Sequence, residues 1–176
     1  MRAIRDWAPS FRNGVWTSVS RVLGMPDRVA AELERSFVNE RKGRVRAFDG
    51  ARSALQALST RFRLALVSNG PGDLQRAKLA AGDLGGLFDR VIISGEVGVA
   101  KPRPRIFMLA LERLGCAPQG ALMIGDDWRN DVEGARLAGV EAIIVDRDRV
   151  GGSQANRSAA AATVQCFADV PALLMR

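Results

Sequence analysis

Short apolar runs alternate with amphipathic helical stretches from residue 48 onward, and this alternation restricts the possible folds more than any other feature. The apolar runs predict strands at 62–67, 91–93, 121–124, 142–145 and 163–167. Helical spacing of apolar residues predicts helices at 51–58, 73–80, 104–114, 132–138 and 171–174. Strands that alternate with helices form a parallel sheet covered on both faces. We therefore expect an α/β fold with a Rossmann-like, doubly wound parallel sheet.

The first 47 residues show helical spacing and no strand pattern. The apolar residues that carry this spacing are Val15, Val19, Val22, Leu23, Val29, Leu33 and Phe37. Pro26 separates two helices and suits the first turn of the second. We expect Trp7, Phe11 and Trp16 to pack between these helices. The chain thus divides into a helical part, residues 1–47, and an α/β part, residues 48–176.

Composition narrows the range of functions. The net charge is +7, from 26 Lys and Arg against 19 Asp and Glu. The basic residues lack regularly spaced aromatic partners, so we expect a solvated basic face and no nucleic-acid binding. No apolar run approaches about 20 residues, so we expect no membrane span. The sequence has no His, which excludes His-based triads and His metal ligands.

The two cysteines, Cys116 and Cys166, are too few and too far apart for a disulfide framework or a zinc site. A chain with this cysteine usage is typical of a reducing compartment. We therefore expect a cytoplasmic localisation.

Three polar groups are predicted to follow strands, and in doubly wound sheets ligands bind beyond the carboxyl ends of the strands. The segment Ser68-Asn69-Gly70 ends one strand and precedes a helix, so it could bind an anion, although it is also an ordinary turn sequence. Lys101 precedes another helix and could neutralise a phosphate or a carboxylate. A solvated Lys before a Pro-initiated helix is the alternative interpretation of Lys101.

The third group is the acidic segment 125–131, which contains Asp126, Asp127 and Asp131 directly after an apolar run. Clustered carboxylates repel one another and are costly to desolvate, so a cation among them would explain the cluster. Mg²⁺ suits such oxygen ligands, because it is held by one or two carboxylates together with waters and a phosphate. A solvated turn with an Asp helix cap is the alternative.

The order of these three groups, each one βα unit apart, resembles the haloacid dehalogenase (HAD) superfamily, in the capped group of small-molecule phosphatases and haloacid dehalogenases. Residues 66–70 resemble the family's second motif, residues 94–107 the third, and residues 123–139 the fourth. Residues 1–42 resemble the latter part of the family's helical cap. The resemblance implies a HAD-like α/β core at residues 48–176, with a partial helical cap at residues 1–47.

The resemblance also implies roles for the polar groups. Ser68 would hydrogen-bond the transferring phosphoryl group, with the backbone of Asn69 and Gly70 nearby. Lys101 would balance the charge on the nucleophile and the phosphate. Phosphoryl transfer needs this neutralisation and in-line positioning above all.

The acidic segment would supply the metal site. By resemblance, Asp126 would bind Mg²⁺ directly or through water, and Asp131 would either support the metal or orient the Lys101 amine. Asp127 would lie behind the metal ligands or would cap the following helix.

The family's first motif, Asp-x-Asp-Gly-[Thr/Val], has no counterpart in this sequence. Its first Asp attacks phosphorus and its second is the general acid and base. Asp49-Gly50 is the nearest match, but Ala47 and Ala51 occupy the place of the other carboxylate in the two possible registers. Asp-Gly is a strong turn signal, so we interpret Asp49 as a turn residue. We expect an N-terminally truncated form of a longer enzyme that is inactive or nearly so.

The resemblance places the missing first core strand in the centre of the sheet, between the strands that end at Ser68 and Asp126. Three or four buried apolar side chains of such a strand contribute roughly 5–10 kcal/mol, and a whole domain is stable by only about 5–15 kcal/mol. We therefore expect a marginally stable chain, or neighbouring strands that close the gap.

The leading functional expectation is a Mg²⁺-dependent phosphatase that acts on a small phosphorylated, anionic metabolite through an aspartyl-phosphate. Dehalogenation of a 2-haloacid is the alternative reaction within the family. A non-catalytic domain that binds a phosphoester or a protein partner is the alternative from another class. A phospho-receiver domain would have the acid pair first and the Lys last, and the order here is the reverse. The sequence leaves the identity of the substrate and the oligomeric state open.

Overall fold

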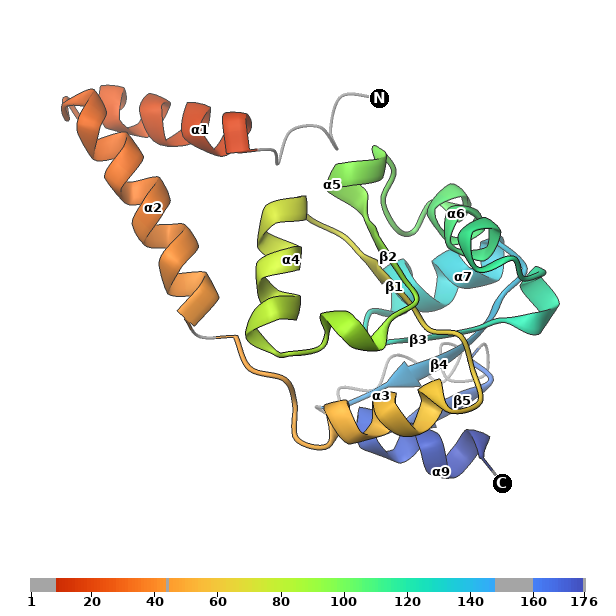
Figure 1. The fold of residues 1–176 in the computed structure, drawn as a ribbon. Coiled ribbons are helices and arrows are strands. Elements are labelled where there is room, and N and C mark those ends of the chain that lie inside the picture. Colours follow the sequence, from red (N-terminus) through yellow and green to blue (C-terminus); the bar gives the residue numbers. More distant parts are fainter. Residues whose placement is uncertain (1–8, 44, 148–159, 176) are drawn as a thin grey trace.

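A computed structural model describes residues 9–43, 45–147 and 160–175 of the 176-residue chain. Figure 1 shows a helical hairpin joined to an α/β part. The hairpin consists of α1 (Pro9–Val22) and α2 (Asp27–Gly43). Trp16 on α1 and Phe37 on α2 pack with their ring centroids 5.9 Å apart, which confirms the expected packing of Trp16. Trp7 and the side chain of Phe11 lie outside the described part of the chain.

The strands are parallel, as the alternating pattern predicts. One sheet pairs β1 (Ala65–Ser68) with β2 (Arg90–Ile93). The other has the order β3 (Leu122–Gly125), β4 (Glu141–Val145), β5 (Ala162–Val164). All five strands differ from their predicted bounds, three of them by a single residue. β1 begins three residues later than predicted, at Ala65, since Phe62 lies in an exposed bend. β5 ends three residues earlier than predicted, at Val164, ahead of the 3₁₀ helix that begins at Phe167.

The expected single sheet is divided into two. Within the described residues no ladder joins β1 to β3, the strands on either side of the position where the HAD resemblance places a central strand. All four residues of β1 and all four of β3 are only partly buried, whereas β4 is buried from Ala142 to Val145. Of the two alternatives, the expectation that neighbouring strands close the gap is therefore wrong for the described strands.

Helices surround these strands. The α-helices of this part are α3 (Ala51–Ser59), α4 (Gly72–Ala81), α5 (Ser94–Val97), α6 (Pro104–Leu114), α7 (Gly134–Leu137) and α9 (Val170–Leu174). The 3₁₀ helices are η2 (Gly85–Leu87), η3 (Pro118–Gly120) and η5 (Phe167–Asp169), and η4 (Trp128–Glu133) is a π-helix. Figure 1 shows α4 and α6 on opposite sides of the β1–β2 pair, as a doubly wound fold requires.

The predicted helix at 132–138 begins earlier than expected, at Trp128, as the π-helix η4. It starts there because the Asp127 side chain accepts a hydrogen bond from the backbone N–H of Asn130. It continues into α7, and Gly139, with φ of 75°, follows the end of that helix as predicted.

The core lies between α6, the η4–α7 segment and strands β2 and β4. Ile92, Ile106 and Ala135 are fully buried in it, and Val132 is 1% exposed. Helix α2 contacts α4 of the α/β part, and the boundary at residue 47 stays a prediction. No helix among the described residues is long and apolar enough to cross a membrane.

Candidate functional site

Parallel strands bring their carboxyl ends to one edge, and the predicted polar groups follow those ends. Ser68 is the last residue of β1 and is partly buried. Gly125 is the last residue of β3, so Asp126 of the acidic segment follows the strand directly. Lys101 follows α5, which itself follows β2. The arrangement is the one expected for a ligand site of a doubly wound fold.

A buried ion pair joins two of these groups. The Lys101 Nζ atom lies 2.5 Å from Oδ1 of Asp131, and the side chains are only 12% and 4% exposed. The other oxygen, Oδ2, accepts a hydrogen bond of 3.0 Å from the backbone N–H of Asp127. A buried carboxylate needs such partners because its desolvation is otherwise costly. The structure therefore brings two of the predicted site residues, Lys101 and Asp131, into direct contact.

Gly125 makes room for this carboxylate. A Cβ atom at position 125 would lie 2.2 Å from Oδ2 of Asp131, well inside van der Waals contact. Only glycine leaves this space without displacing Asp131.

The Ser68-Asn69-Gly70 turn is tied to Lys101 by its middle residue. The Asn69 Nδ2 group donates to the Lys101 carbonyl at 2.9 Å, and the Lys101 backbone N–H donates to Asn69 Oδ1 at 2.9 Å. The side chain of Asn69 thus fixes the backbone from which the Lys101 side chain extends. The sequence predicted these residues for one site but not this pairing, which joins positions 32 residues apart.

Gly70 and Ser94 form a second connection at this edge. The Gly70 backbone N–H donates to Oγ of Ser94 at 2.9 Å, and Ser94 is only 3% exposed. This N–H group already donates to Ser94, so it is less available to bind an anion than a free N–H group in a phosphate-binding turn. Gly70 has φ of 132°, a backbone conformation that side-chain-bearing residues rarely adopt.

Asp127 is a helix cap. Its Oδ1 accepts from the backbone N–H of Asn130 at 2.8 Å, and its Oδ2 accepts from Asn130 Nδ2 at 2.8 Å. The backbone hydrogen bond from Asn130 is the largest influence that holds the pKa of Asp127 below its usual value. Of the two roles considered for Asp127, the geometry supports capping.

Asp126 is exposed and has a partner that the sequence did not indicate. Its Oδ2 lies 3.1 Å from Nη2 of Arg147, and the Asp126 side chain is 62% exposed. The Arg147 guanidinium also lies over the ring of Phe48, 3.7 Å from its centroid. Arg147 follows the carboxyl end of β4 by two residues, so the strand-end rule could have found it.

In the described part of the chain, the carboxylates suit a Mg²⁺ site with one or two carboxylate ligands but not a site with three or more. Among the described residues there is no group of three or more Asp, Glu, Cys or His side chains that could hold a metal ion. Mg²⁺ needs only one or two carboxylates when waters and a phosphate complete its ligands. Both oxygens of Asp131 are engaged, which makes the exposed carboxylate of Asp126 the better candidate ligand.

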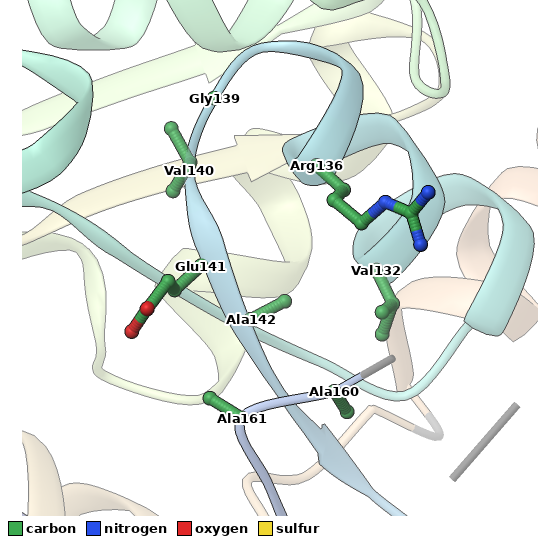
Figure 2. A pocket seen from close by; sticks show the side chains of 8 residues that line it. All are labelled: Val132, Arg136, Gly139, Val140, Glu141, Ala142, Ala160 and Ala161. Atoms are coloured by element: carbon green, nitrogen blue, oxygen red, sulfur yellow. The ribbon is translucent and has the colours of Figure 1, made fainter. Parts of the chain in front are cut away.

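The cavity in Figure 2 is a different place on the molecule. It has a volume of about 410 Å³, and its lining includes Arg136, Glu141, Ala142 and Ala161. Glu141 and Ala142 are the first residues of β4, so this cavity lies at the amino end of that strand and not at the edge where the candidate site residues follow the strands.

Comparison with known proteins identifies the family that the three motifs resemble. The sequence model of a family described as haloacid dehalogenase-like hydrolase matches residues 2–139. A phosphoserine phosphatase of Thermus thermophilus is 44% identical over 149 residues, which cover 84% of this chain and 59% of that protein. A glyceraldehyde 3-phosphate phosphatase of Methanothermobacter thermautotrophicus is 37% identical over 114 residues, covering 64% of this chain and 50% of that protein.

Solved structures give the same result for the fold. The crystal structure of a HAD phosphatase from Thermococcus onnurineus superposes with a TM-score of 0.69 at 26% identity, covering 94% of this chain and 88% of that one. The chain spans only about half to three fifths of the length of the two curated relatives above.

Proposed function

Because this chain belongs to the haloacid dehalogenase-like hydrolase family, we propose that its strand-end site serves the Mg²⁺-assisted hydrolysis of small phosphorylated metabolites. The observation that carries the proposal is the buried contact of 2.5 Å between Lys101 and Asp131, which is tied through Asn69 to the turn that contains Ser68. An ammonium held by Asp131, on a backbone tied to the turn that contains Ser68, suits a phosphate group, because phosphoryl transfer depends on charge neutralisation and positioning.

In this proposal each side chain has one task. Ser68 donates a hydrogen bond to the phosphoryl group, Lys101 neutralises its charge, and Asp131 holds the Lys101 amine in place. Asp126 holds the metal ion, which supplies charge stabilisation at the phosphate when bound.

We also propose a cytoplasmic localisation, as the cysteine usage of the sequence predicts. Both cysteines, Cys116 and Cys166, are free.

The reaction also needs a carboxylate nucleophile, which the Asp-x-Asp-Gly motif provides in the family. In this sequence the nearest match, Asp49-Gly50, lacks one of the two carboxylates of that motif, because Ala47 or Ala51 stands in its place. We propose that turnover requires a segment with this motif and that the chain as given hydrolyses phosphorylated substrates slowly or not at all. The names of the two curated relatives favour phosphatase chemistry over dehalogenation and make phosphoserine and glyceraldehyde 3-phosphate the first compounds to assay.

The test measures hydrolysis of p-nitrophenyl phosphate, with and without Mg²⁺, by this chain and by a version that carries an Asp-x-Asp-Gly strand ahead of Met1. We expect Mg²⁺-dependent hydrolysis only with the added strand, and loss of the metal dependence in its Asp126→Asn variant. An extended chain with no phosphatase activity would contradict the proposal. Release of chloride from 2-chloropropionate would favour the dehalogenase instead.

A binding function without turnover is the second candidate, because the Lys101–Asp131 pair tied to the Ser68 turn suits phosphate binding as well as phosphoryl transfer. It predicts that the chain as given binds phosphoserine in a Mg²⁺-dependent way and that Lys101→Met abolishes the binding. Isothermal titration calorimetry with phosphoserine tests this outcome directly.

A further inference from the structure

We propose that Arg147 is a resident counter-ion of Asp126 that competes with Mg²⁺ for this carboxylate and so sets the metal affinity of the site. The inference rests on the proposed metal site at Asp126. It concerns a residue to which neither the motifs nor the proposed function assigns a role.

Three segments far apart in the sequence meet at this point. Asp126 follows β3, Arg147 follows β4, and Phe48 lies in the segment that leads into α3. Arg147 Nη2 is 3.1 Å from Asp126 Oδ2, and its guanidinium lies 3.7 Å from the centroid of the Phe48 ring. The aromatic face attracts the cation and holds it in the orientation that reaches the carboxylate.

A guanidinium and a divalent cation at the same carboxylate oppose each other. Both are positive, and at separations of a few ångströms their repulsion weakens the binding of each. The guanidinium also occupies a carboxylate oxygen that would otherwise be a metal ligand. Because ion pairs between exposed side chains are weak, Mg²⁺ can displace Arg147 rather than being excluded by it.

The neighbouring carboxylates cannot easily take over the metal. Both oxygens of Asp131 are engaged, with Lys101 Nζ and the backbone N–H of Asp127. Both oxygens of Asp127 accept hydrogen bonds from Asn130. A cation that enters the acidic segment therefore meets Asp126, and with it Arg147.

The experiment is isothermal titration calorimetry of MgCl₂ into the full chain without substrate. We expect Arg147→Ala to bind Mg²⁺ about two- to fivefold more tightly than the wild type, as removal of one exposed ion pair suggests. Phe48→Leu, which removes the aromatic face but keeps the charge, is expected to change the affinity in the same direction by a smaller factor.

Arg52→Ala is the matched control. It removes the same charge from another exposed ion pair, in which Arg52 Nη1 lies 2.6 Å from Asp83 Oδ2. We expect no more than a small general effect of net charge in this variant. Asp126→Asn is expected to lose the binding, which assigns the heat to this carboxylate.

The outcomes separate the two ideas. If the wild type binds Mg²⁺ through Asp126 but Arg147→Ala binds no more tightly than Arg52→Ala, the counter-ion inference is wrong and the metal site stands. If no protein, Arg147→Ala included, binds Mg²⁺ through Asp126, the proposed metal site fails and the inference fails with it. Binding that is measurable in Arg147→Ala alone supports both.

Discussion

One buried carboxylate, Asp131, organises the candidate site. It contacts the amine of Lys101 through one oxygen and a backbone N–H through the other, and it is 3% exposed. Removing a partner from a buried ion pair usually costs more than the pair contributes, because the remaining charge is left without compensation. At the scale of single residues, the geometry around Asp131 should therefore tolerate little change.

Gly125→Ala tests this geometry. The new Cβ would lie 2.2 Å from Asp131 Oδ2, so Asp131 must move away from Lys101 and the folded state is strained. We expect a loss of about 1–3 kcal/mol in the free energy of unfolding, measured by urea denaturation. Gly86→Ala is the control, because a Cβ there has no atom within 4 Å, and we expect a change of no more than about 0.5 kcal/mol. Equal stabilities for the two variants would show that Gly125 is not required for space.

Asp127 gives a pH-dependent prediction. Hydrogen bonding from the Asn130 backbone lowers its pKa below the ordinary value of 3.8. A group with a depressed pKa stabilises the folded state above its unfolded pKa and loses that contribution as the pH falls through its folded pKa. We expect Asp127→Ala to cost about 0.5–1 kcal/mol at pH 7, as the loss of an exposed helix cap does.

The measurement is urea denaturation of both proteins in metal-free buffer at pH 7 and at about pH 3. The difference in stability between wild type and Asp127→Ala should shrink at the lower pH. A difference that is the same at both pH values would mean that the carboxylate charge of Asp127 does not contribute.

At the scale of elements, α6 shows how one helix face builds the core beside the site. Its buried residues are Ile106, Phe107, Ala110 and Leu111, and the helix contacts both β1 and β2. The same helix starts three residues beyond Lys101, at Pro104. Its packing therefore holds the segment from which the Lys101 side chain extends.

Ile106→Ala is expected to cost about 2–5 kcal/mol, because Ile106 is fully buried and the vacated space cannot close completely. Met108→Ala on the same helix is the control: Met108 is 40% exposed, and we expect a change of about 0.5 kcal/mol or less. Thermal or urea denaturation compares the two. Similar costs for both would contradict the assignment of the buried face.

At the scale of the whole molecule, the division into two sheets is the main structural finding. β4 has a paired strand on each side, whereas β1 pairs with β2 alone among the described strands. Parallel strands are normally buried on both faces and paired on both edges in the interior of a sheet. The described β1 and β3 are instead partly exposed along their whole length.

Amide hydrogen exchange tests this division. We expect the amides of Ile143 and Ile144 in β4 to exchange more slowly than those of Leu66 and Val67 in β1, because strands with fewer partners open at lower cost. The measurement is exchange followed by mass spectrometry or NMR under native conditions. Protection of β1 equal to that of β4 would show that the two sheets open as one unit.

Local signals predicted the elements well where they act within a few residues. Helix α6 has the predicted bounds, because Pro104 begins it and Gly115, with φ of 62°, ends it. The four residues that carry the helical spacing of the predicted 51–58 helix are all buried in α3: Ala51, Ala54, Leu55 and Leu58. The start of η4 was predicted less well: the helix begins at Trp128 and not at Val132, because the Asp127 side chain caps it there.

The sequence by itself determined the parallel α/β architecture and the strand-end positions of Ser68, Lys101 and the acidic segment, because apolar periodicity and capping residues act locally. Only the tertiary structure decided which of these groups touch: Lys101 contacts Asp131 across 30 residues of sequence, and Asp126 contacts Arg147 across 21. Such contacts depend on how separate βα units lie against one another, which local pattern does not encode. The separation of β1 from β3 is also a tertiary result, because backbone pairing between distant strands is settled only when the whole sheet forms.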